Sequence, residues 1–371
     1  MNTTSTHVDL DDADALQEAD RDGLLRASAM AGAQVRATAA AVEEGALDPV
    51  TGGQRPRTVV WLAGRGPAAA AGAMLIAVLG GIAGEPLVAA AEAPPWIGPL
   101  DVLIVAGDDP GDRNLVTAAH TAVRRGARVV VAAPNLGPLR DATAGRCAVL
   151  EPRLSVPDEF GLCRYLAAGL ATMAAVDPAP RQPIDGLAAL ADDLDAEAVR
   201  NSVGREMLTN PAKTLAERMA GRQVLLAGDR PVTCALARHG ASVLLRVGGH
   251  PVAAAELADV LVALRDGGPA QGKAAGFGDP VDALFHDEQI DGPPPDRPRV
   301  VALALAEERA VLSSRLAGIG GADLLVADDV GDTGSASAAD DTINGDRTER
   351  QLATLAVRLE MAAVYRKLAR G

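Results

Sequence analysis

Three carboxylates occupy the short turn in which a buried strand gives way to a helix. The apolar run 101–106 is followed by a glycine and then by Asp108, Asp109 and Asp112. In an open α/β sheet, such a turn directs backbone N–H groups and the positive end of the next helix toward a ligand, usually an anion. A carboxylate repels a phosphate and has no proton to donate to it. The turn therefore has the position of a phosphate cradle and the wrong chemistry for one.

Two further roles would suit the aspartates. Several carboxylates on one loop could bind a hard cation, although their spacing does not fit an EF-hand. The simpler alternative is N-capping, in which an aspartate satisfies the free N–H groups of the helix that starts near Asp112. Elsewhere, His239 and His250 have no cysteine or carboxylate at ligand spacing, so no zinc site is expected.

A second turn with the composition of an anion site lies earlier in the chain. Gly64-Arg65-Gly66 follows the first strand and opens a helix, as nucleotide- and anion-binding turns do. Glu92 lies about where a dinucleotide site needs an acidic residue, but Pro67 and Ala68 interrupt the glycine pattern. Close packing of the helix on the strand is the alternative. The ligand-binding candidates are Gly64, Arg65, Gly66, Asp108, Asp109, Gly111 and Arg113.

Alternating strands and helices must position these turns. In the first half, hydrophobic periodicity predicts helices at 16–46, 67–83, 112–125, 158–176 and 184–200, and strands at 58–63, 87–91, 101–106, 127–132 and 146–150. The second half is predicted to contain strands at 223–227, 241–247, 299–305 and 323–327, and helices at 210–221, 231–239, 251–265, 306–317 and 347–369. Such alternation is typical of βαβ units and a mostly parallel sheet.

The fold class that follows is α/β, with two subdomains whose parallel sheets are flanked by helices, and with N- and C-terminal helices packed across them. Long loops are expected at 266–297 and 328–346, where glycine, proline and acidic residues accumulate. The expected parts are a disordered N-terminus at 1–15, a first domain at 16–180, a second domain at 181–346 and a C-terminal helix at 347–371.

Composition and charge argue against several classes of function. The chain of 371 residues has a net charge of −14, so its surface repels nucleic acids and anionic membranes. The uncharged stretch 66–84 follows a strand directly, which favours a buried helix over a membrane span. Three widely spaced cysteines and the polar, acidic start of the chain predict a cytoplasmic protein. Neither a nucleic acid nor a membrane is an expected partner.

A series of short motifs occurs in a recognisable order: VVWLAGRGPA (59–68), PPWI (94–97), VAGDDPGD (105–112), NPAKTLA (210–216), FHDEQI (285–290) and AVYRKL (363–368). This order resembles the sugar isomerase (SIS) fold of the bifunctional phosphoglucose/phosphomannose isomerases, and in particular their degenerate TobH-like branch. The resemblance implies enzymes that bind a sugar phosphate through Ser and Thr of two turns. They move a proton between C1 and C2 with a glutamate base, a histidine and a C-terminal lysine.

The chain departs from that pattern at four places. Ala68 stands where the first turn should offer a serine, and Asp108 to Gly111 replace Ser, Gly, Asn and Thr of the second turn. The predicted strand 241–247 places Leu244 or Leu245 about where the resemblance implies the base. Lys367 lies in the long last helix rather than in the short one that carries the family's lysine. These departures predict lost or changed chemistry on a retained fold.

One element of the family's site remains. His286 and Glu288 lie in FHDEQ, which resembles the family motif Asn-His-Asn-Glu. In the family this histidine assists ring opening and reaches into the partner subunit's site, so the resemblance implies a homodimer. The alternative is an exposed or interface histidine with no role in catalysis.

We therefore expect a carbohydrate-derivative-binding protein of sugar-phosphate or mannose metabolism, without cofactor or metal, that is catalytically degenerate and has a binding or regulatory role. The alternative is an active glucose-6-phosphate/mannose-6-phosphate isomerase in which His286 and Glu288 are catalytic. Arg65, Arg113 or Arg140 would then have to bind the phosphate. A third hypothesis is a ligand without phosphate, such as an amine or a metal-bound species attracted by the aspartates.

Overall fold

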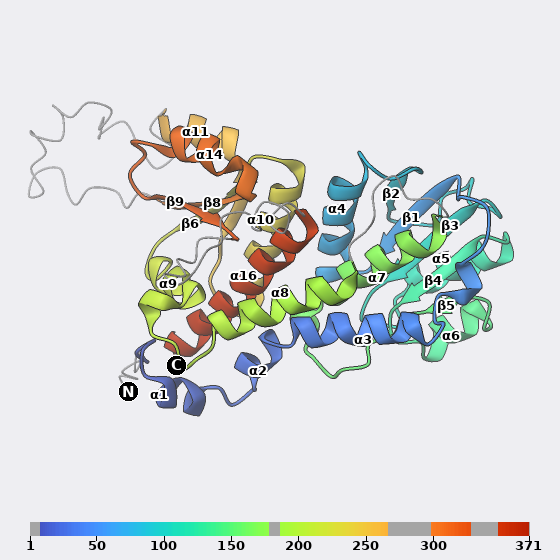
Figure 1. Ribbon diagram of the computed structural model, residues 1–371, viewed down its shortest axis with the longest axis horizontal. Coiled ribbons are helices and arrows are strands. Elements are labelled where there is room, and N and C mark those ends of the chain that lie inside the picture. Colours follow the sequence, from blue (N-terminus) through green and yellow to red (C-terminus); the bar gives the residue numbers. More distant parts are fainter. Residues whose placement is uncertain (1–7, 178–185, 266–297, 328–347, 371) are drawn as a thin grey trace, which may run out of the picture.

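Two parallel sheets lie toward opposite ends of the molecule, with helices between them (Figure 1). The computed structural model describes residues 8–177, 186–265, 298–327 and 348–370. The first sheet has the order β2-β1-β3-β4-β5. Its strands are β1 (Thr58–Ala63), β2 (Leu87–Ala90), β3 (Asp101–Ala106), β4 (Arg128–Ala132) and β5 (Ala148–Val149). The second sheet, in the order β7-β6-β8-β9, contains β6 (Val224–Gly228), β7 (Ala253–Glu256), β8 (Arg299–Ala304) and β9 (Ala322–Val326).

Helices cover both faces of each sheet, which is why the central strands are continuous apolar runs. On one face of the first sheet lie α5 (Arg113–Arg124) and α6 (Gly137–Thr143). Its other face packs against the large core that contains α3 (Ala31–Glu43), α4 (Pro67–Leu79) and α7 (Leu162–Val176). The second sheet has α11 (Leu257–Arg265) and α14 (Arg309–Leu316) on one face. Its other face packs against α9 (Pro211–Arg218) and α10 (Pro231–Arg246).

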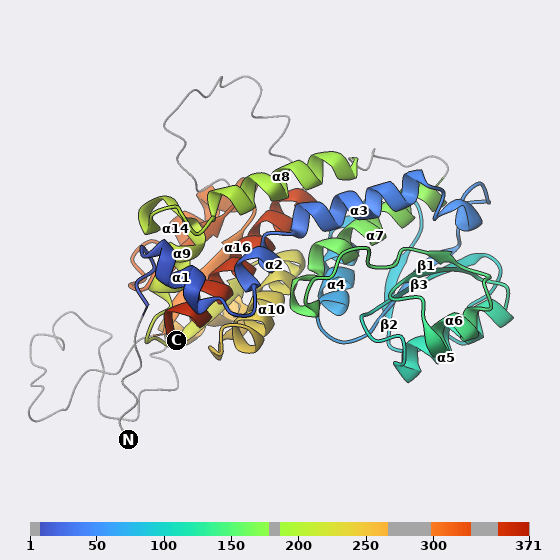
Figure 2. The ribbon, with the colours of Figure 1, turned by 90° about the horizontal axis from the view of Figure 1, so that it is seen from below.

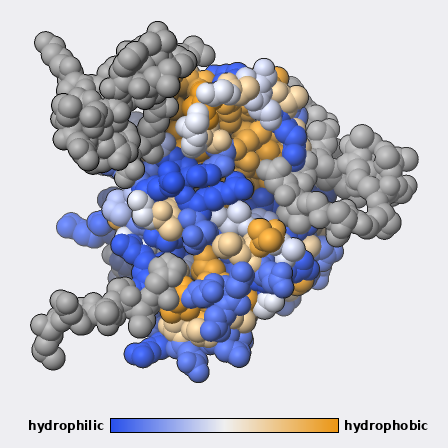
Figure 3. All heavy atoms as spheres, turned by 90° about the vertical axis from the view of Figure 1, so that its left-hand side faces the viewer, coloured by the Kyte–Doolittle hydropathy of each residue, from blue (hydrophilic) through white to orange (hydrophobic). Residues whose placement is uncertain are grey.

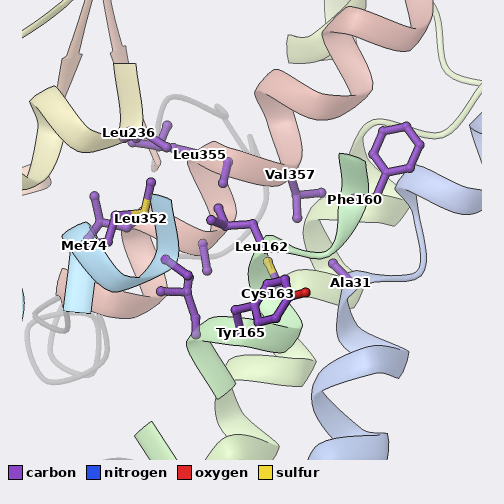
Figure 4. Packing of buried hydrophobic residues seen from close by; sticks show 14 of the residues in the cluster. Ala31, Met74, Phe160, Leu162, Cys163, Tyr165, Leu236, Leu352, Leu355 and Val357 are labelled. Atoms are coloured by element: carbon purple, nitrogen blue, oxygen red, sulfur yellow. The ribbon is translucent and has the colours of Figure 1, made fainter. Parts of the chain in front are cut away.

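A single large core joins the two sheets, and Figure 4 shows its centre. Met74 of α4, Leu162 of α7 and Leu236 of α10 lie there beside Leu352 and Leu355 of the last helix, α16 (Thr348–Arg370). Figure 2 shows part of α3 alongside part of α8 (Leu187–Arg200), and the two helices are in contact. One continuous apolar interior therefore holds the two sheets together.

The helix α16 is buried on nearly every side, and charged side chains lie inside with it. Arg358 is fully buried and donates to Glu197 of α8, with Nε–Oε1 at 2.7 Å and Nη2–Oε2 at 3.2 Å. Two further N–H groups bind the carbonyls of Val326 and Ala327 at the end of β9. Glu360 contacts His239 of α10 at 2.9 Å, and burial raises the pKa of Glu360.

The predicted strand at 241–247 is wrong, because these residues form the second half of α10. Gly240, which separates the predicted helix and strand, lies inside α10, where a Cβ would come within 2.8 Å of Leu226 Cδ1. The strand follows later as β7, so the predicted helix 251–265 is shortened to α11.

Smaller differences lie at the N-terminus. The single helix predicted at 16–46 is divided into α1 (Ala13–Ala19), α2 (Leu24–Ser28) and α3. Gly23, with φ of 68°, precedes α2 and redirects the chain. Residues expected in a disordered tail contact the fold, since Leu10 is buried and Val8 N donates to Ala369 O. The predicted loops 266–297 and 328–346 lie outside the described residues.

None of the helices described is both long and apolar enough to cross a membrane. The uncharged stretch 66–84 forms α4, which packs between α7 and α10. Gly72 permits this packing on the sheet, because a Cβ there would lie 2.2 Å from Cδ1 of the Trp61 ring.

Replacing one acceptor of Arg358 tests how strongly the fold depends on this pair. We expect Glu197→Gln to lower the free energy of unfolding by about 3–5 kcal/mol, because it leaves a charge buried without its counterion. Urea denaturation followed by circular dichroism measures this loss. In the exposed pair of Glu44 with Arg153, Glu44→Gln should change stability little. Equal losses in the two variants would contradict the prediction.

Replacement of a buried carboxyl at the edge of the first sheet should stabilise the protein in a pH-dependent way. The Glu85 side chain is 1% exposed, and neither carboxyl oxygen has a hydrogen-bond partner among the described residues. Burial and Asp177 raise its pKa more than Arg55 and Arg128 lower it. The folded state therefore binds this proton more tightly than the unfolded state, and ionised Glu85 costs stability at neutral pH.

We expect Glu85→Gln to stabilise the protein at pH 7 by on the order of 1 kcal/mol, and the gain to vanish below about pH 4, where both states are protonated. Denaturation curves at the two pH values measure it. Glu92→Gln, at an exposed site, is the matched control. A gain equally large at both pH values would disprove an electrostatic origin.

Candidate functional site

The two candidate turns lie side by side at the carboxyl edge of the first sheet. They follow the neighbouring strands β1 and β3, between which the strand order reverses, and ligands bind at such points in open α/β sheets. Gly64 N donates to Ala106 O at 2.7 Å. A Cβ on Gly64 would lie 3.6 Å from Gly107 Cα and 3.7 Å from Asp112 Oδ2. The structure thus brings together the two turns singled out in the sequence.

In the turn after β3, carboxylates of the chain itself bind the backbone N–H groups. Asp112 caps α5 by accepting from Asn114 N at 2.8 Å, so the predicted N-capping is confirmed. Asp109 accepts from Gly111 N at 2.7 Å. An external anion would have to compete with two attached carboxylates for these donors, in a turn of the same charge sign. This geometry disfavours phosphate.

Asp108 has different partners from the other two aspartates. Its Oδ1 accepts from Arg164 Nη2 at 2.8 Å and from the Tyr165 hydroxyl, both in the first turn of α7. Arg164 is 7% exposed, and its guanidinium stacks on the Tyr165 ring with Cζ 4.1 Å from the centroid. Burial, together with this acidic neighbour, raises the pKa of Tyr165. The side chain of Asp108 is therefore fixed by a buried cation and a phenol.

Sequence reasoning missed Arg164 and Tyr165. They lie in the predicted helix 158–176, and the only signal was a polar pair in the apolar segment LCRYLAAGLATMAAV. A buried arginine needs a carboxylate. The sequence does not show that this carboxylate comes from a turn 56 residues away.

A cavity of about 350 Å³ opens beside Asp108, at the ends of β3, β4 and β5. The lining consists of Gln34, Asp108, Pro134, residues 152–158, Gly161 and Arg164. Partial burial raises the pKa of Asp158, and the carboxylates of Asp108 and Glu159 add to this. Arginine guanidinium and carboxylate groups are thus gathered around one cavity.

The turn after β1 contributes less than its composition suggests. Gly66 adopts a φ of 76° where α4 begins, and Ala68 is buried against the sheet, with its carbonyl accepting from Trp61 Nε1 at 3.0 Å. Close packing thus accounts for this end of the helix. Arg65 and Arg113 are exposed, and their side chains form no hydrogen bond or ion pair within the described part of the chain.

The structure places the residues expected at the family's base and lysine positions in settings that differ from the expected ones. Leu244 and Leu245 lie in α10, so their assignment to the base position on a strand is wrong. The next strand, β7, ends in an exposed carboxylate, Glu256. Lys367 forms an ion pair with Asp22 at 2.7 Å. His286 and Glu288 lie outside the described residues.

The NPAK motif has a structural role here. Asn210 caps α9 by accepting from Lys213 N at 2.9 Å. The buried Lys213 ammonium donates to the carbonyls of Val203 and Arg205 at 2.7 and 2.8 Å. This lysine thus fixes the loop before α9.

In the described parts of the chain, no three His, Cys, Asp or Glu side chains are grouped so that they could hold a metal ion. His239 pairs with Glu360 in the core. The three aspartates of the turn bind backbone or Arg164, which gives them partners other than a cation.

Comparison with known proteins identifies the fold. A Clostridium novyi protein proposed to be a tagatose-6-phosphate ketose/aldose isomerase has a TM-score of 0.59 at 11% identity, over 95% of this chain and 90% of that one. The C-terminal domain of glucosamine-fructose-6-phosphate aminotransferase from Francisella tularensis has a TM-score of 0.57 at 9% identity (95% and 98% covered). Tagatose-6-phosphate ketose/aldose isomerase from Escherichia coli has 0.53 at 14% (96% and 94%). No family model and no curated protein matches the sequence. The chain has the sugar isomerase fold.

Neutralising Asp108 tests its role as the partner of Arg164. We expect Asp108→Asn to lower the free energy of unfolding by about 3 kcal/mol, because the buried guanidinium loses its counterion. Asp109→Asn, in the same turn but with only a local hydrogen bond, should cost less than about 1 kcal/mol. Thermal or urea denaturation compares the two variants. An Asp109→Asn loss as large as that of Asp108→Asn would show that the turn, not the ion pair, is responsible.

Proposed function

We propose that this protein binds a carbohydrate derivative on a sugar isomerase fold without isomerising a sugar phosphate, and has a binding or regulatory role in sugar-phosphate or mannose metabolism. The fold and the named activities of its structural neighbours support the carbohydrate class. One observation carries the proposed loss of isomerase activity. Two N–H groups of the turn after β3, those of Gly111 and Asn114, are bound by Asp109 and Asp112 of the chain itself.

The proposal does not rest on the missing base. Leu244 and Leu245 lie in a helix, so they say nothing about the residue at the base position. It rests on charge: a hexose phosphate would place its dianion against carboxylates that already occupy the donors. Burial of Ala68 in the neighbouring turn supports the same conclusion, because no hydroxyl is present there.

The second candidate function is an active aldose–ketose isomerase. It is favoured by Arg65 and Arg113, which lie exposed in or beside the two turns and could bind a phosphate as bidentate donors. His286 and Glu288 would then be the catalytic residues, as the family resemblance implies. A homodimer would be needed to bring His286 into the site of the partner, and it stays a prediction.

In the predicted homodimer, we expect the second copy of the chain to pack on the outer end of the second sheet. Figure 3 shows hydrophobic residues gathered in part of this face, among hydrophilic ones. Val262 of α11 and Val311 of α14 are both more than half exposed. Exposed apolar surface marks places where chains associate.

An isomerase assay separates the two functions. We expect no interconversion of glucose 6-phosphate, mannose 6-phosphate and fructose 6-phosphate above the rate of a His286→Ala control. The same hexose phosphates should not raise the melting temperature at millimolar concentrations, because a ligand stabilises only the state that it binds. Turnover that His286→Ala abolishes would establish the isomerase instead.

A charge-removing variant sharpens this test. Asp112→Ser keeps an N-capping side chain and removes one negative charge. Combined with Asp109→Ser, it should allow inorganic phosphate to stabilise the protein measurably, whereas Asp141→Ser on the exposed face of α6 should not. Phosphate binding already present in the unmodified protein would contradict the charge argument.

A further inference from the structure

The connection that leads into β3 presents apolar side chains to solvent at the amino edge of the first sheet. Four of its residues are exposed: Pro95, Trp96, Pro99 and Leu100. Trp96 is 47% exposed and Leu100 is 55% exposed, whereas the other tryptophan of the chain lies in the core. Because these side chains are neighbours in one short segment rather than scattered singly, they form a patch of the kind at which proteins bind one another.

Hydrogen bonds fix this connection, so Trp96 is not exposed on a loose loop. Arg57 Nη2 donates to the Trp96 carbonyl at 3.0 Å, and its guanidinium lies over the indole, with Cζ 5.6 Å from the ring centroid. Arg125 donates to the Pro95 carbonyl, and Ile97 is buried against the sheet. A surface that is already fixed loses little conformational entropy when a partner binds to it.

Arginines surround the exposed apolar residues. Five arginines but only one carboxylate lie in the three segments that meet at this edge, which are 50–57, 94–101 and 124–128. The carboxylates that pair with Arg55 and Arg57 have side chains at most 5% exposed. Arg124 and Arg125 are exposed and form no ion pair within the described residues. In a chain with a net charge of −14, the outer surface of this edge therefore has a local excess of positive charge.

These features determine which chemistry would complement the surface. An aliphatic or aromatic side chain would cover Trp96 and Leu100, and carboxylates beside it would pair with the arginines. A second copy related by twofold symmetry would bring the patch against itself, where its arginines would repel one another. Tryptophan and arginine are also the residues that most often dominate the binding energy of protein interfaces.

We propose that an acidic segment of a partner protein binds this surface, which consists of Arg57, Pro95, Trp96, Leu100 and Arg125 and is called the Trp96 surface below. A large apolar side chain of the partner packs on the indole, and carboxylates on either side of it pair with the two arginines. The proposal goes beyond the carbohydrate-binding function and does not rest on it, because the candidate sugar site lies at the opposite, carboxyl edge of the same sheet.

Selection from a phage-displayed library of random peptides tests the proposal on the full chain. We expect the recovered peptides to contain a large apolar residue between acidic ones, and a synthetic peptide of that consensus is then the probe. Trp96→Ala should weaken its binding by about tenfold or more. Arg125→Gln, which keeps a donor for the Pro95 carbonyl and removes the charge, should do the same. The matched controls Leu208→Ala and Arg222→Gln, at exposed sites in the second half, should leave the affinity unchanged.

Intrinsic fluorescence supplies a second readout that needs no variant. Trp61 is 2% exposed, so the quencher acrylamide reaches mainly Trp96. The bound peptide should reduce the quenching, because it covers the indole. Added salt should weaken the binding, because the paired charges lie at the surface.

Four results would overturn the proposal: recovery of no peptide, a consensus without acidic residues, an affinity that Trp96→Ala leaves unchanged, or quenching that the bound peptide does not reduce. Tighter binding of single-stranded oligo(dT), weakened by the same two variants, would assign the Trp96 surface to nucleic acid instead. None of these results bears on the binding or turnover of hexose phosphates, so failure here and failure of the proposed function are distinguishable.

Discussion

The buried ion pair between Arg358 and Glu197 constrains how the two halves of this protein meet. A guanidinium in an apolar interior must have all its donors satisfied, and here the acceptors come from α8 and from the end of β9. The last helix therefore has one rotation and one depth at which it can lie between the sheets. Both α8 and α10 pack on this helix.

The same rule, that a buried charge needs a partner, shapes the candidate site. Arg164 is buried in the first turn of α7, and the nearest strand end supplies Asp108 as its counterion. A turn that could have received an anionic ligand is thereby used within the molecule. Because a cavity remains beside this pair, the site is changed in chemistry rather than closed.

Most of the fold could be predicted from hydrophobic patterning, because strands buried on both faces are short apolar runs. The positions of β1, β3, β4, β6 and β8 follow from such runs. N-capping is one of the roles that the sequence suggests for the aspartates of the turn after β3, and Asp112 has it. The strand expected at 241–247 is wrong because Gly240 resembles a glycine that ends a helix. In the structure this glycine lies inside the helix, where close packing on Leu226 and Leu359 requires it. The partnership of Arg164 with Asp108 depends on tertiary contact, which no local pattern reveals.

The place of α16 in the molecule also sets the order in which the protein can be made. This helix follows the strands of both sheets in the chain, yet it fills the centre of the core and its end lies against the N-terminal segment, where Val8 bonds to Ala369. The first sheet, with its local βαβ connections, can form during synthesis. The groove for α16 stays open, with its apolar lining exposed to solvent, until α16 itself has been made. Synthesis of α16 is therefore the step that allows the core to close.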